Sequence, residues 1–335
     1  MKGTPFDVSR LIKTSHYNII SSLLFGKRFA HDDATLRRLV DLLDEVNKIV
    51  PEQLVLNFME WLKYVPGDPF KVRRRRFLVD EIFKMVEKSV DEHKETLENS
   101  KSDDFIYSFL KEQGKRKLNK ESLEGFADRD ILILGYALYF TSAPVVDVLY
   151  WFILYLVHNQ DVVVRMRKEI QENVGTNKPV TMADQEKLPY CRAVMYEVLR
   201  MSFTKVNLSP THTFSEDLTV NGYTLPKGAW LMAALCTVNL DPNIFTEPEK
   251  FKPERFINER GQLFGFEKVY ASFSMGPRDC LGKSLAKMEI FLFLTTLVRN
   301  YDIENEAGKP LPSLEGTSKG FRVADPYQVC LKKKD

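Results

Sequence analysis

One cysteine in this sequence stands in a setting that favours metal ligation. Residues 273–282 read F-S-M-G-P-R-D-C-L-G, and Cys280 directly precedes an apolar helical pattern. At the beginning of a helix, free N–H groups and the positive end of the helix dipole stabilise a thiolate, which is the form of cysteine that binds metal ions. A lone cysteine before a helix is more often a small core residue, so the prediction rests on the whole spacing F-x-x-G-x-R-x-C-x-G.

The residues around Cys280 are of types that suit a flat cofactor with acidic groups. Gly276 and Gly282 permit a tight turn and a close approach of the backbone to such a cofactor. Arg278 places a cation near the sulfur and can hold a carboxylate, and Phe273 can cover the metal–sulfur bond and exclude water. The loop therefore predicts a cofactor site whose metal ligand is Cys280.

This spacing resembles the haem-binding signature of the cytochrome P450 family, with no position missing. The resemblance implies that the Cys280 thiolate is the proximal ligand of the iron of haem b (iron protoporphyrin IX), where it favours O–O cleavage. His212, in P-T-H-T, matches a position where the family often binds a haem propionate, although a lone histidine there can also be a loop residue. The resemblance also implies haem contacts by other residues of the motif, namely Phe273, Gly276, Arg278 and Gly282.

Two further motifs resemble the part of the family that braces the cysteine loop. Glu197 and Arg200 form E-x-x-R, and a spacing of three places both on one face of a helix. Taken alone, this pair could be an ordinary surface ion pair. Arg255, in F-K-P-E-R-F, would join them in a buried triad. Because an unpaired buried charge is costly, we expect all three residues to be present in one network or none of them to be buried.

The segment that should activate oxygen departs from the family pattern. Residues 140–144 (F-T-S-A-P) align with A-G-x-[DE]-T, so that Ala143 replaces the acid and Pro144 replaces the alcohol. The proline removes an amide, and a kink is still expected. Thr141 and Ser142 are the hydroxyl groups that could position water, and they are the catalytic candidates. The resemblance implies a substrate pocket lined by residues 139–142, 203–209 and 320–323.

The similarity extends over essentially the whole chain and is closest to animal microsomal, drug- and steroid-oxidising members, as in residues 18–29, 188–194 and 240–242. The fold class expected is mainly α with a small β-rich subdomain, a cytochrome P450 fold lacking its N-terminal third. Residues 1–335 are expected to form one truncated domain, helix-rich over 1–210, with a β-rich annex, the cysteine loop and a final helix over 211–335.

The leading hypothesis is a monooxygenase that inserts one oxygen atom from O2 into an apolar substrate. The resemblance implies electrons from NADPH-cytochrome P450 reductase and a place on the cytoplasmic face of the endoplasmic reticulum membrane, through an anchor that we expect outside this chain. Two alternatives remain open. One is an enzyme of the same fold that rearranges or dehydrates a peroxide. The other is a non-catalytic haem-binding fragment.

The elements that must position these residues can be predicted from hydrophobic spacing. Asn221-Gly222 predicts a hairpin with a type I′ turn over residues 218–225. A short helix should begin after Thr181, and residues 111–120 should form an exposed loop. Strands are expected over residues 229–238 and 321–331. Helices are expected over residues 36–50, 79–93, 105–110, 131–157, 161–172, 190–201 and 281–300.

Charge, cysteine usage and hydropathy limit the classes of protein to which this chain can belong. The chain has 335 residues and a net charge of +2, which argues against a nucleic-acid partner. Its four cysteines show no short pairing pattern. This use of cysteine is typical of proteins in a reducing compartment or at the face of one. Residues 131–157 are long and apolar enough to cross a bilayer, but Asp147 and Pro144 favour a buried core helix. Residues 73–76 are four arginines that predict a solvated helix face or a site for anionic lipid or an acidic partner.

Overall fold

The computed structural model describes residues 3–98, 102–176, 178–202, 212–264, 272–318 and 322–334. The chain divides into two compact units. One consists of Ser9–Val146, and the other of Met1–Val8 with Asp147–Asp335. The long helix α5 (Asp128–His158) contributes residues to both units. The expectation of a single domain over residues 1–335 therefore stays a prediction, and each unit is described by itself.

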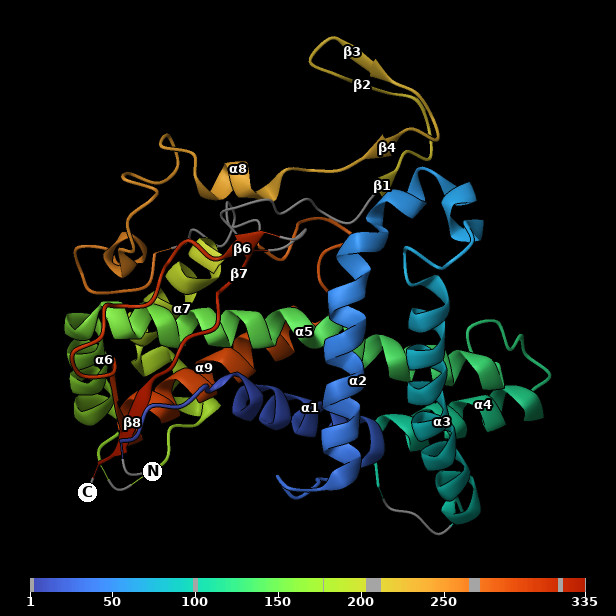
Figure 1. Ribbon diagram of the computed structural model, residues 1–335, viewed down its shortest axis with the longest axis horizontal. Coiled ribbons are helices and arrows are strands. Elements are labelled where there is room, and N and C mark those ends of the chain that lie inside the picture. The colour runs from blue at the N-terminus through green and yellow to red at the C-terminus, as the bar shows by residue number, and fades with distance from the viewer. Residues whose placement is uncertain are drawn as a thin grey trace. The chain divides into compact units, whose positions relative to one another are not determined.

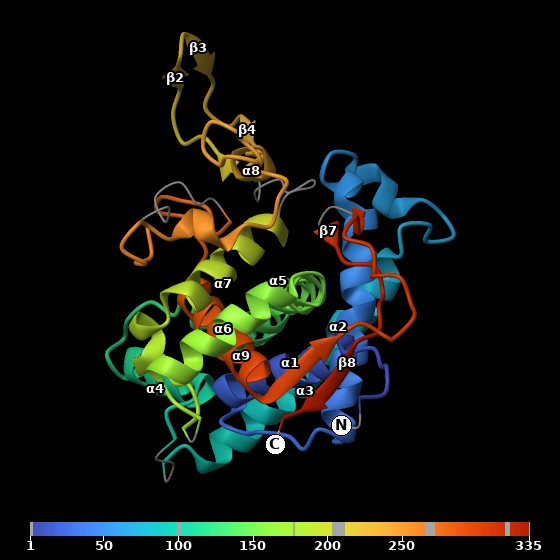
Figure 2. The same ribbon diagram turned by 90° about the vertical axis from the view of Figure 1, so that its left-hand side faces the viewer.

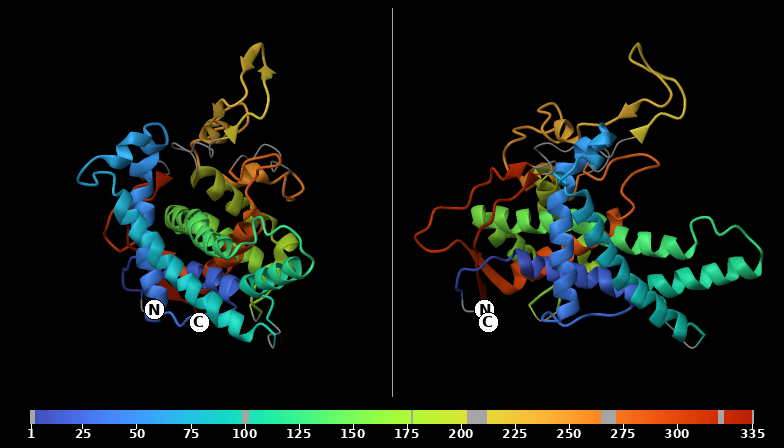
Figure 3. Two further views of the ribbon diagram at one scale, coloured as in Figure 1. Left: turned by 90° about the vertical axis from the view of Figure 1, so that its right-hand side faces the viewer. Right: turned by 45° about the vertical axis from the view of Figure 1, so that its right-hand side comes forward.

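The unit Ser9–Val146 is helical throughout its described elements (Figure 1). Helices α2 and α3 lie side by side, and the two short 3₁₀ helices between them lie beyond one end of that pair (Figure 3). Besides the first part of α5, its elements are α1 (Ser9–Phe25), α2 (Ala34–Ile49), η1 (Val50–Asn57), η2 (Glu60–Tyr64), α3 (Val72–Thr96) and α4 (Phe105–Leu118).

Local sequence explains where these helices begin. The Asp33 side chain accepts hydrogen bonds from the N–H groups of Thr35 and Leu36 and so caps α2. The Asp104 side chain caps α4 through the N–H of Tyr107. One apolar face of each helix is buried, as in α3, where the residues Leu78, Ile82, Val86 and Val90 recur at helical spacing.

The other unit combines helices with short antiparallel strand pairs. Helices α6, α7 and α9 pack against one another (Figure 2). The described strands pair as β1–β4, β2–β3, β5–β8 and β6–β7. Its helices are α6 (Gln160–Asn173), η3 (Met182–Lys187), α7 (Pro189–Ser202), α8 (Leu235–Asn239), η4 (Pro253–Phe256) and α9 (Lys283–Asn300). Its strands are β1 (His212–Thr213), β2 (Leu218–Val220), β3 (Tyr223–Leu225), β4 (Trp230–Leu231), β5 (Tyr301–Glu304), β6 (Thr317–Ser318), β7 (Arg322–Val323) and β8 (Cys330–Lys333).

The later part of α5 supplies much of this unit's core, because residues 148–157 are all buried. Trp151 is fully buried, its indole N–H donates to the carbonyl of Arg322, and the Arg322 guanidinium lies 4.2 Å from its ring. By length and composition α5 could cross a membrane, but 61% of its most apolar stretch is buried, as in the core helix of a soluble protein. The burial agrees with the core helix predicted from the sequence.

Most predicted elements are confirmed, and the mainly α fold class with small sheets is correct. The type I′ hairpin is present, because Asn221 and Gly222 both have positive φ between β2 and β3. Two predictions are wrong. The loop expected over residues 111–120 is mostly helix, because α4 continues to Leu118. The strand expected over 229–238 is limited to Trp230–Leu231, and the chain then turns into α8.

Candidate functional site

The cysteine loop is closed by backbone hydrogen bonds that lead directly into α9. The N–H of Cys280 donates to the carbonyl of Phe273 over 2.9 Å, and the N–H of Lys283 donates to the carbonyl of Cys280 over 3.1 Å. Gly276 has a φ of 87°, in the region that favours glycine. Gly282 is the N-cap of α9, and a β-carbon there would lie 3.9 Å from the Cys280 sulfur. The loop therefore holds the thiol at the beginning of the helix, as the sequence predicts.

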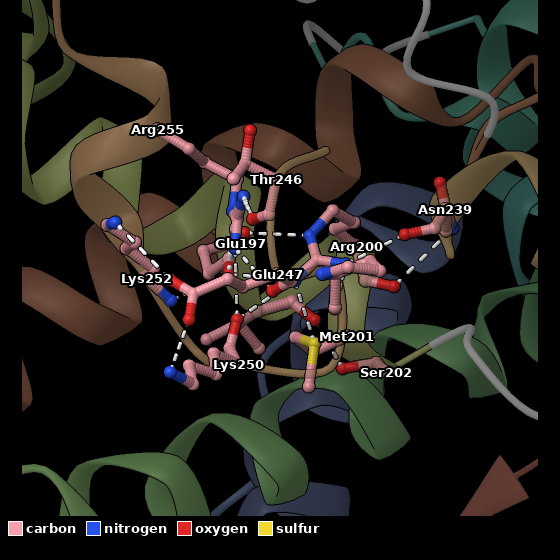
Figure 4. Close-up of polar contacts among 12 residues, drawn as sticks. Glu197, Arg200, Met201, Ser202, Asn239, Thr246, Glu247, Lys250, Lys252 and Arg255 are labelled. Carbon is pink, nitrogen blue, oxygen red and sulfur yellow. Dashed lines mark hydrogen bonds and ion pairs between the residues drawn. The ribbon is translucent and has the colours of Figure 1, made fainter. Parts of the chain in front are cut away.

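Glu197, Arg200 and Arg255 form one buried network in the same unit (Figure 4). Arg200 donates to both carboxylate oxygens of Glu197, each over 2.8 Å, in a bidentate pair whose side chains are 0% exposed. The Nε of Arg255 donates to Glu197 over 3.1 Å, and the backbone N–H of Lys252 donates to it over 2.7 Å. The triad expected from the two motifs is confirmed.

The two arginines use their remaining N–H groups on backbone carbonyls. Phe245 lies beneath both, with its ring 5.1 Å from the guanidinium carbon of Arg200 and 5.9 Å from that of Arg255. The network thereby fastens α7 to the irregular segment 239–255, whose own backbone hydrogen bonds close short turns. The carbonyls that accept from Arg200 belong to Asn239, Pro248 and Lys250, and those that accept from Arg255 belong to Thr246, Glu247 and Lys250.

Two contacts connect the braced helix α7 to the cysteine loop. The Ser272 hydroxyl donates to the carbonyl of Leu199 over 3.4 Å. Lys287, on α9, donates to the Tyr196 hydroxyl over 3.3 Å, and its ammonium lies 6.0 Å from the centre of the Phe273 ring. Sequence reasoning missed these connecting residues because Ser, Lys and Tyr at these positions carry no spacing that predicts a contact across the chain.

The other predicted haem contacts in this unit are placed as follows. Arg278 is exposed, and Phe273 is half-buried. His212 is half-buried in β1, opposite Leu231 of β4. Their contacts to haem stay predictions. The expected pocket residues 203–209, 320 and 321 lie outside the described residues, and Arg322 is buried with its guanidinium bonded to the carbonyls of Met201, Leu314 and Glu315.

The candidate oxygen-activating segment belongs to the unit Ser9–Val146. Thr141 is exposed and its hydroxyl donates to the carbonyl of Ala137 over 2.7 Å. Ser142 is half-buried and donates to the carbonyl of Tyr139 over 2.9 Å. Tyr139 was expected to face substrate, and this is wrong. Its side chain is fully buried, with its hydroxyl 2.8 Å from that of Ser21, and burial raises the pKa of this phenol.

The residues present in the loop fit a haem. Cys280 is a free and exposed thiol, and all four cysteines are free in the described chain. The adjacent Leu281 is fully exposed, and Met275 is 63% exposed, so apolar side chains reach solvent beside the thiol. The described residues contain no cluster of three or more metal-binding side chains. A single cysteine beside apolar groups fits a haem, because the porphyrin would supply the other ligands of the iron and Cys280 would supply the sulfur.

Comparison with known proteins gives a consistent result. The profile of the family "Cytochrome P450" matches residues 1–331. "Cytochrome P450 2D4" of Rattus norvegicus is 33% identical over 336 residues, which is 98% of this chain and 65% of that protein. "Vitamin D(3) 25-hydroxylase" of Sus scrofa is 33% identical over 334 residues, 98% of this chain and 65% of that protein.

A third relative is more distant at the same coverage of this chain. "Cytochrome P450 2U1" of Homo sapiens is 29% identical over 332 residues, which is 98% of this chain and 60% of that protein. The chain therefore spans 60 to 65% of the length of these relatives.

Proposed function

This chain belongs to the cytochrome P450 family, and from that premise we propose that the protein is a haem-thiolate monooxygenase. The reaction inserts one atom of O2 into an apolar organic substrate and releases the other as water, with two electrons from a reductase and two protons. Haem b is the cofactor of this family and supplies, when bound, the reductive activation of dioxygen. The name of one relative, a vitamin D(3) 25-hydroxylase, agrees with an oxidising role.

The observation that carries this proposal is the position of Cys280. Its thiol is free and exposed at the beginning of α9, in a loop closed by the hydrogen bond from its own N–H to Phe273. In the proposal Cys280 ligates the iron, while Arg278 and His212 hold the propionates.

The other residues have positioning roles in this proposal. The triad of Glu197, Arg200 and Arg255 holds α7 and the segment 239–255 together. The hydrogen bond from Ser272 to the carbonyl of Leu199 then connects α7 to the cysteine loop. Thr141 and Ser142 carry hydroxyl groups that can orient water next to the substrate. Gly282 keeps the backbone next to the sulfur free of a side chain, and Gly276 permits the positive φ of the loop.

We propose NADPH-cytochrome P450 reductase as the electron donor and the cytoplasmic face of the endoplasmic reticulum membrane as the location. A segment of the unit Ser9–Val146 supports a membrane location. Phe58, Trp61 and Tyr64 are 65%, 66% and 83% exposed, and the arginine run at the beginning of α3 follows them. Aromatic residues beside cations are typical of a surface that meets the lipid headgroups.

The ligand assignment can be tested by reducing the haem-loaded, full-length protein under carbon monoxide. The wild-type protein should show the long-wavelength Soret band of thiolate-ligated haem. Cys280→Ser should lose that band, whereas Cys236→Ser, which removes a half-buried thiol elsewhere in the same unit, should keep it. A Cys280→Ser spectrum identical to the wild-type spectrum would overturn the assignment.

A second candidate function is the rearrangement or dehydration of a peroxide by the same fold. It is favoured by the segment 140–144, where the hydroxyls of Thr141 and Ser142 are bonded to carbonyls of their own helix and Ala143 and Pro144 carry no proton donor. Such a reaction needs no relay of protons to O2. Turnover of an organic peroxide without reductase would support it, and product formation that requires both NADPH and O2 would exclude it.

A further inference from the structure

Lys287 lies on α9, seven residues after Cys280, and its side chain extends to α7, which packs against α9 (Figure 2). Its ammonium donates to the Tyr196 hydroxyl over 3.3 Å and lies 5.0 Å from the centre of the Tyr196 ring. The same ammonium lies 6.0 Å from the centre of the Phe273 ring. One cation therefore adjoins two aromatic side chains, one on the braced helix and one in the cysteine loop.

Tyr196 gives that cation a fixed anchor. It is 4% exposed, and its ring lies 5.9 Å from the ring of Phe256, at the end of η4. It directly precedes Glu197, whose carboxylate is held by Arg200 and Arg255. Because this backbone belongs to the braced helix, the hydroxyl is held in place. It fixes the end of a lysine side chain, which otherwise has many accessible rotamers.

The ring of Phe273 can be oriented by this cation. Its carbonyl accepts the N–H of Cys280 over 2.9 Å, so its backbone is fixed beside the residue that carries the sulfur. That bond does not select among the rotamers of the Phe273 side chain, which is half-buried. A cation over the face of a phenylalanine ring, within about 6 Å of its centre, attracts the ring electrostatically. Lys287 therefore favours one orientation of the Phe273 ring.

A neighbouring cation of the same helix is arranged differently. Lys283 lies one turn before Lys287, and its ammonium is 3.9 Å from the carboxylate of Asp279. Asp279 directly precedes Cys280, so Lys283 carries the same charge close to the same loop. Its partner is a carboxylate, whereas the partners of Lys287 are aromatic side chains. The two lysines therefore separate the effect of a cation near the loop from the effect of a cation over the Phe273 ring.

We propose that Lys287 is a positioning residue for the haem thiolate. Anchored by the Tyr196 hydroxyl, its ammonium holds the Phe273 ring over the Cys280 sulfur, and the ring keeps water from that sulfur. Because water that reaches a thiolate can protonate it, Lys287 slows the conversion of the ligating thiolate to a neutral thiol. The inference rests on the proposed monooxygenase function, and it adds a residue that lies outside the signature 273–282.

The conversion of thiolate to thiol can be followed in the reduced, carbon monoxide-bound protein, used at full length and loaded with haem. Its long-wavelength Soret band is replaced by a band at shorter wavelength as the sulfur becomes protonated. Lys287→Met keeps an unbranched side chain but removes the cation, so it should convert about 2- to 5-fold faster than the wild-type protein. Lys287→Arg keeps a cation and a donor, and it should convert at nearly the wild-type rate.

Two matched variants test the anchor and the charge separately. Tyr196→Phe keeps the ring and the cation but removes the hydrogen bond that anchors the cation, so it should also convert a few-fold faster. Lys283→Met removes the neighbouring cation, whose partner is Asp279, and should leave the rate unchanged. An equal acceleration by Lys283→Met and Lys287→Met would assign the effect to the charge of the helix and overturn the positioning role.

A double-mutant cycle with Phe273→Leu distinguishes an action through the ring from a general tie between α7 and α9. Phe273→Leu leaves no aromatic face for the cation, so Lys287→Met should cause no further acceleration in that background. The same acceleration in both backgrounds would overturn the inference while the monooxygenase proposal stands. Absence of the long-wavelength band in the wild-type protein would instead overturn the monooxygenase proposal, and the inference with it.

Discussion

Glu197 is the residue on which two buried positive charges converge. Its carboxylate accepts two hydrogen bonds from Arg200, one from Arg255 and one from the N–H of Lys252. Removing it would leave two guanidinium groups facing each other with no negative charge between them. Because the side chains of Glu197 and Arg200 are 0% exposed, water cannot replace the lost interaction without opening the structure.

Glu197→Gln should therefore lower the free energy of unfolding by about 3–5 kcal/mol, the range for breaking a buried ion pair. Urea unfolding of the haem-loaded protein measures this. Glu254→Gln is the matched control, since its carboxylate pairs with Arg165 where both side chains are about half exposed. That control should cost at most about 1 kcal/mol. Equal losses in the two variants would show that the triad is no stronger than a surface pair.

Single residues also show which parts of the site can be read from sequence. The motifs identify four site residues by their spacing: Cys280, Glu197, Arg200 and Arg255. Helical periodicity also places Glu197 and Arg200 on one face of their helix. Tyr139 could not be placed in this way. Its burial depends on the hydroxyl of Ser21, which is 118 residues away in the sequence, and no local pattern reports a partner at that separation.

At the scale of elements, α5 is fastened to the C-terminal segment by two tyrosines of the same unit. The Tyr150 hydroxyl accepts the N–H of Tyr327 over 3.0 Å, and the Tyr327 hydroxyl donates to the carbonyl of Tyr150 over 2.7 Å. Burial raises the pKa of Tyr150 to about 12, and the hydrogen bond from Tyr327 acts in the opposite direction. The folded protein thus prefers the neutral phenol.

This preference predicts an alkaline loss of stability. The folded pKa lies above the value of about 10 in the unfolded chain. Tyr150 therefore stabilises the fold fully below pH 10, and that contribution is lost as the pH rises from about 10 towards 12. Tyr150→Phe should be about 1 kcal/mol less stable at pH 7, because the Tyr327 N–H loses its acceptor. Its unfolding free energy should fall less steeply above pH 10, and parallel curves in urea titrations would contradict the argument.

The segment with η1 and η2 is the element proposed to meet the membrane, and its tryptophan offers a direct test. Vesicles with brominated anionic lipid should quench the fluorescence of Trp61, which is 66% exposed and precedes the arginines of α3 in the chain. Trp61→Phe should abolish most of this quenching. Trp230→Phe, which removes another exposed tryptophan at 56%, should leave it nearly unchanged. The reverse pattern would exclude this segment as the contact.

Elements were predicted well where hydrophobic spacing is regular and poorly where charge obscures it. The stretch 111–120 is rich in lysine, so it was expected to be a loop. It is helical because Arg116 pairs with Glu112 one turn earlier and the buried Gln113 donates to the carbonyl of Phe126 and to Asp128. The strand expected over residues 229–238 was too long. β-Propensity reflects how well a side chain fits a half-buried sheet surface, and it does not show whether a neighbouring strand is present. Trp230 and Leu231 are the residues of this stretch that pair with a strand, β1.

At the scale of the whole molecule, the residues proposed to bind haem match the family pattern, whereas the segment proposed to deliver protons to oxygen departs from it. The cysteine loop and its brace keep every residue of the family signature. The segment 140–144 lies on α5, where Pro144 supplies no N–H for the carbonyl of Phe140 and Ala143 supplies no acid. A protein with this combination would ligate haem normally but deliver protons to oxygen poorly, so much of the NADPH consumed should yield peroxide or water instead of product.

The double variant Ala143→Glu with Pro144→Thr should correct that defect. A positioned acid and alcohol contribute general acid catalysis, so the fraction of NADPH electrons recovered in oxidised substrate should rise severalfold, towards the limit of one product per NADPH. The ratio of product to NADPH in the reconstituted full-length protein measures this. Pro144→Ala restores the helix amide without a proton donor and should leave the ratio close to that of the wild-type protein. A gain of equal size in Pro144→Ala would assign the defect to helix geometry, and no gain in the double variant would show that this segment does not limit proton delivery.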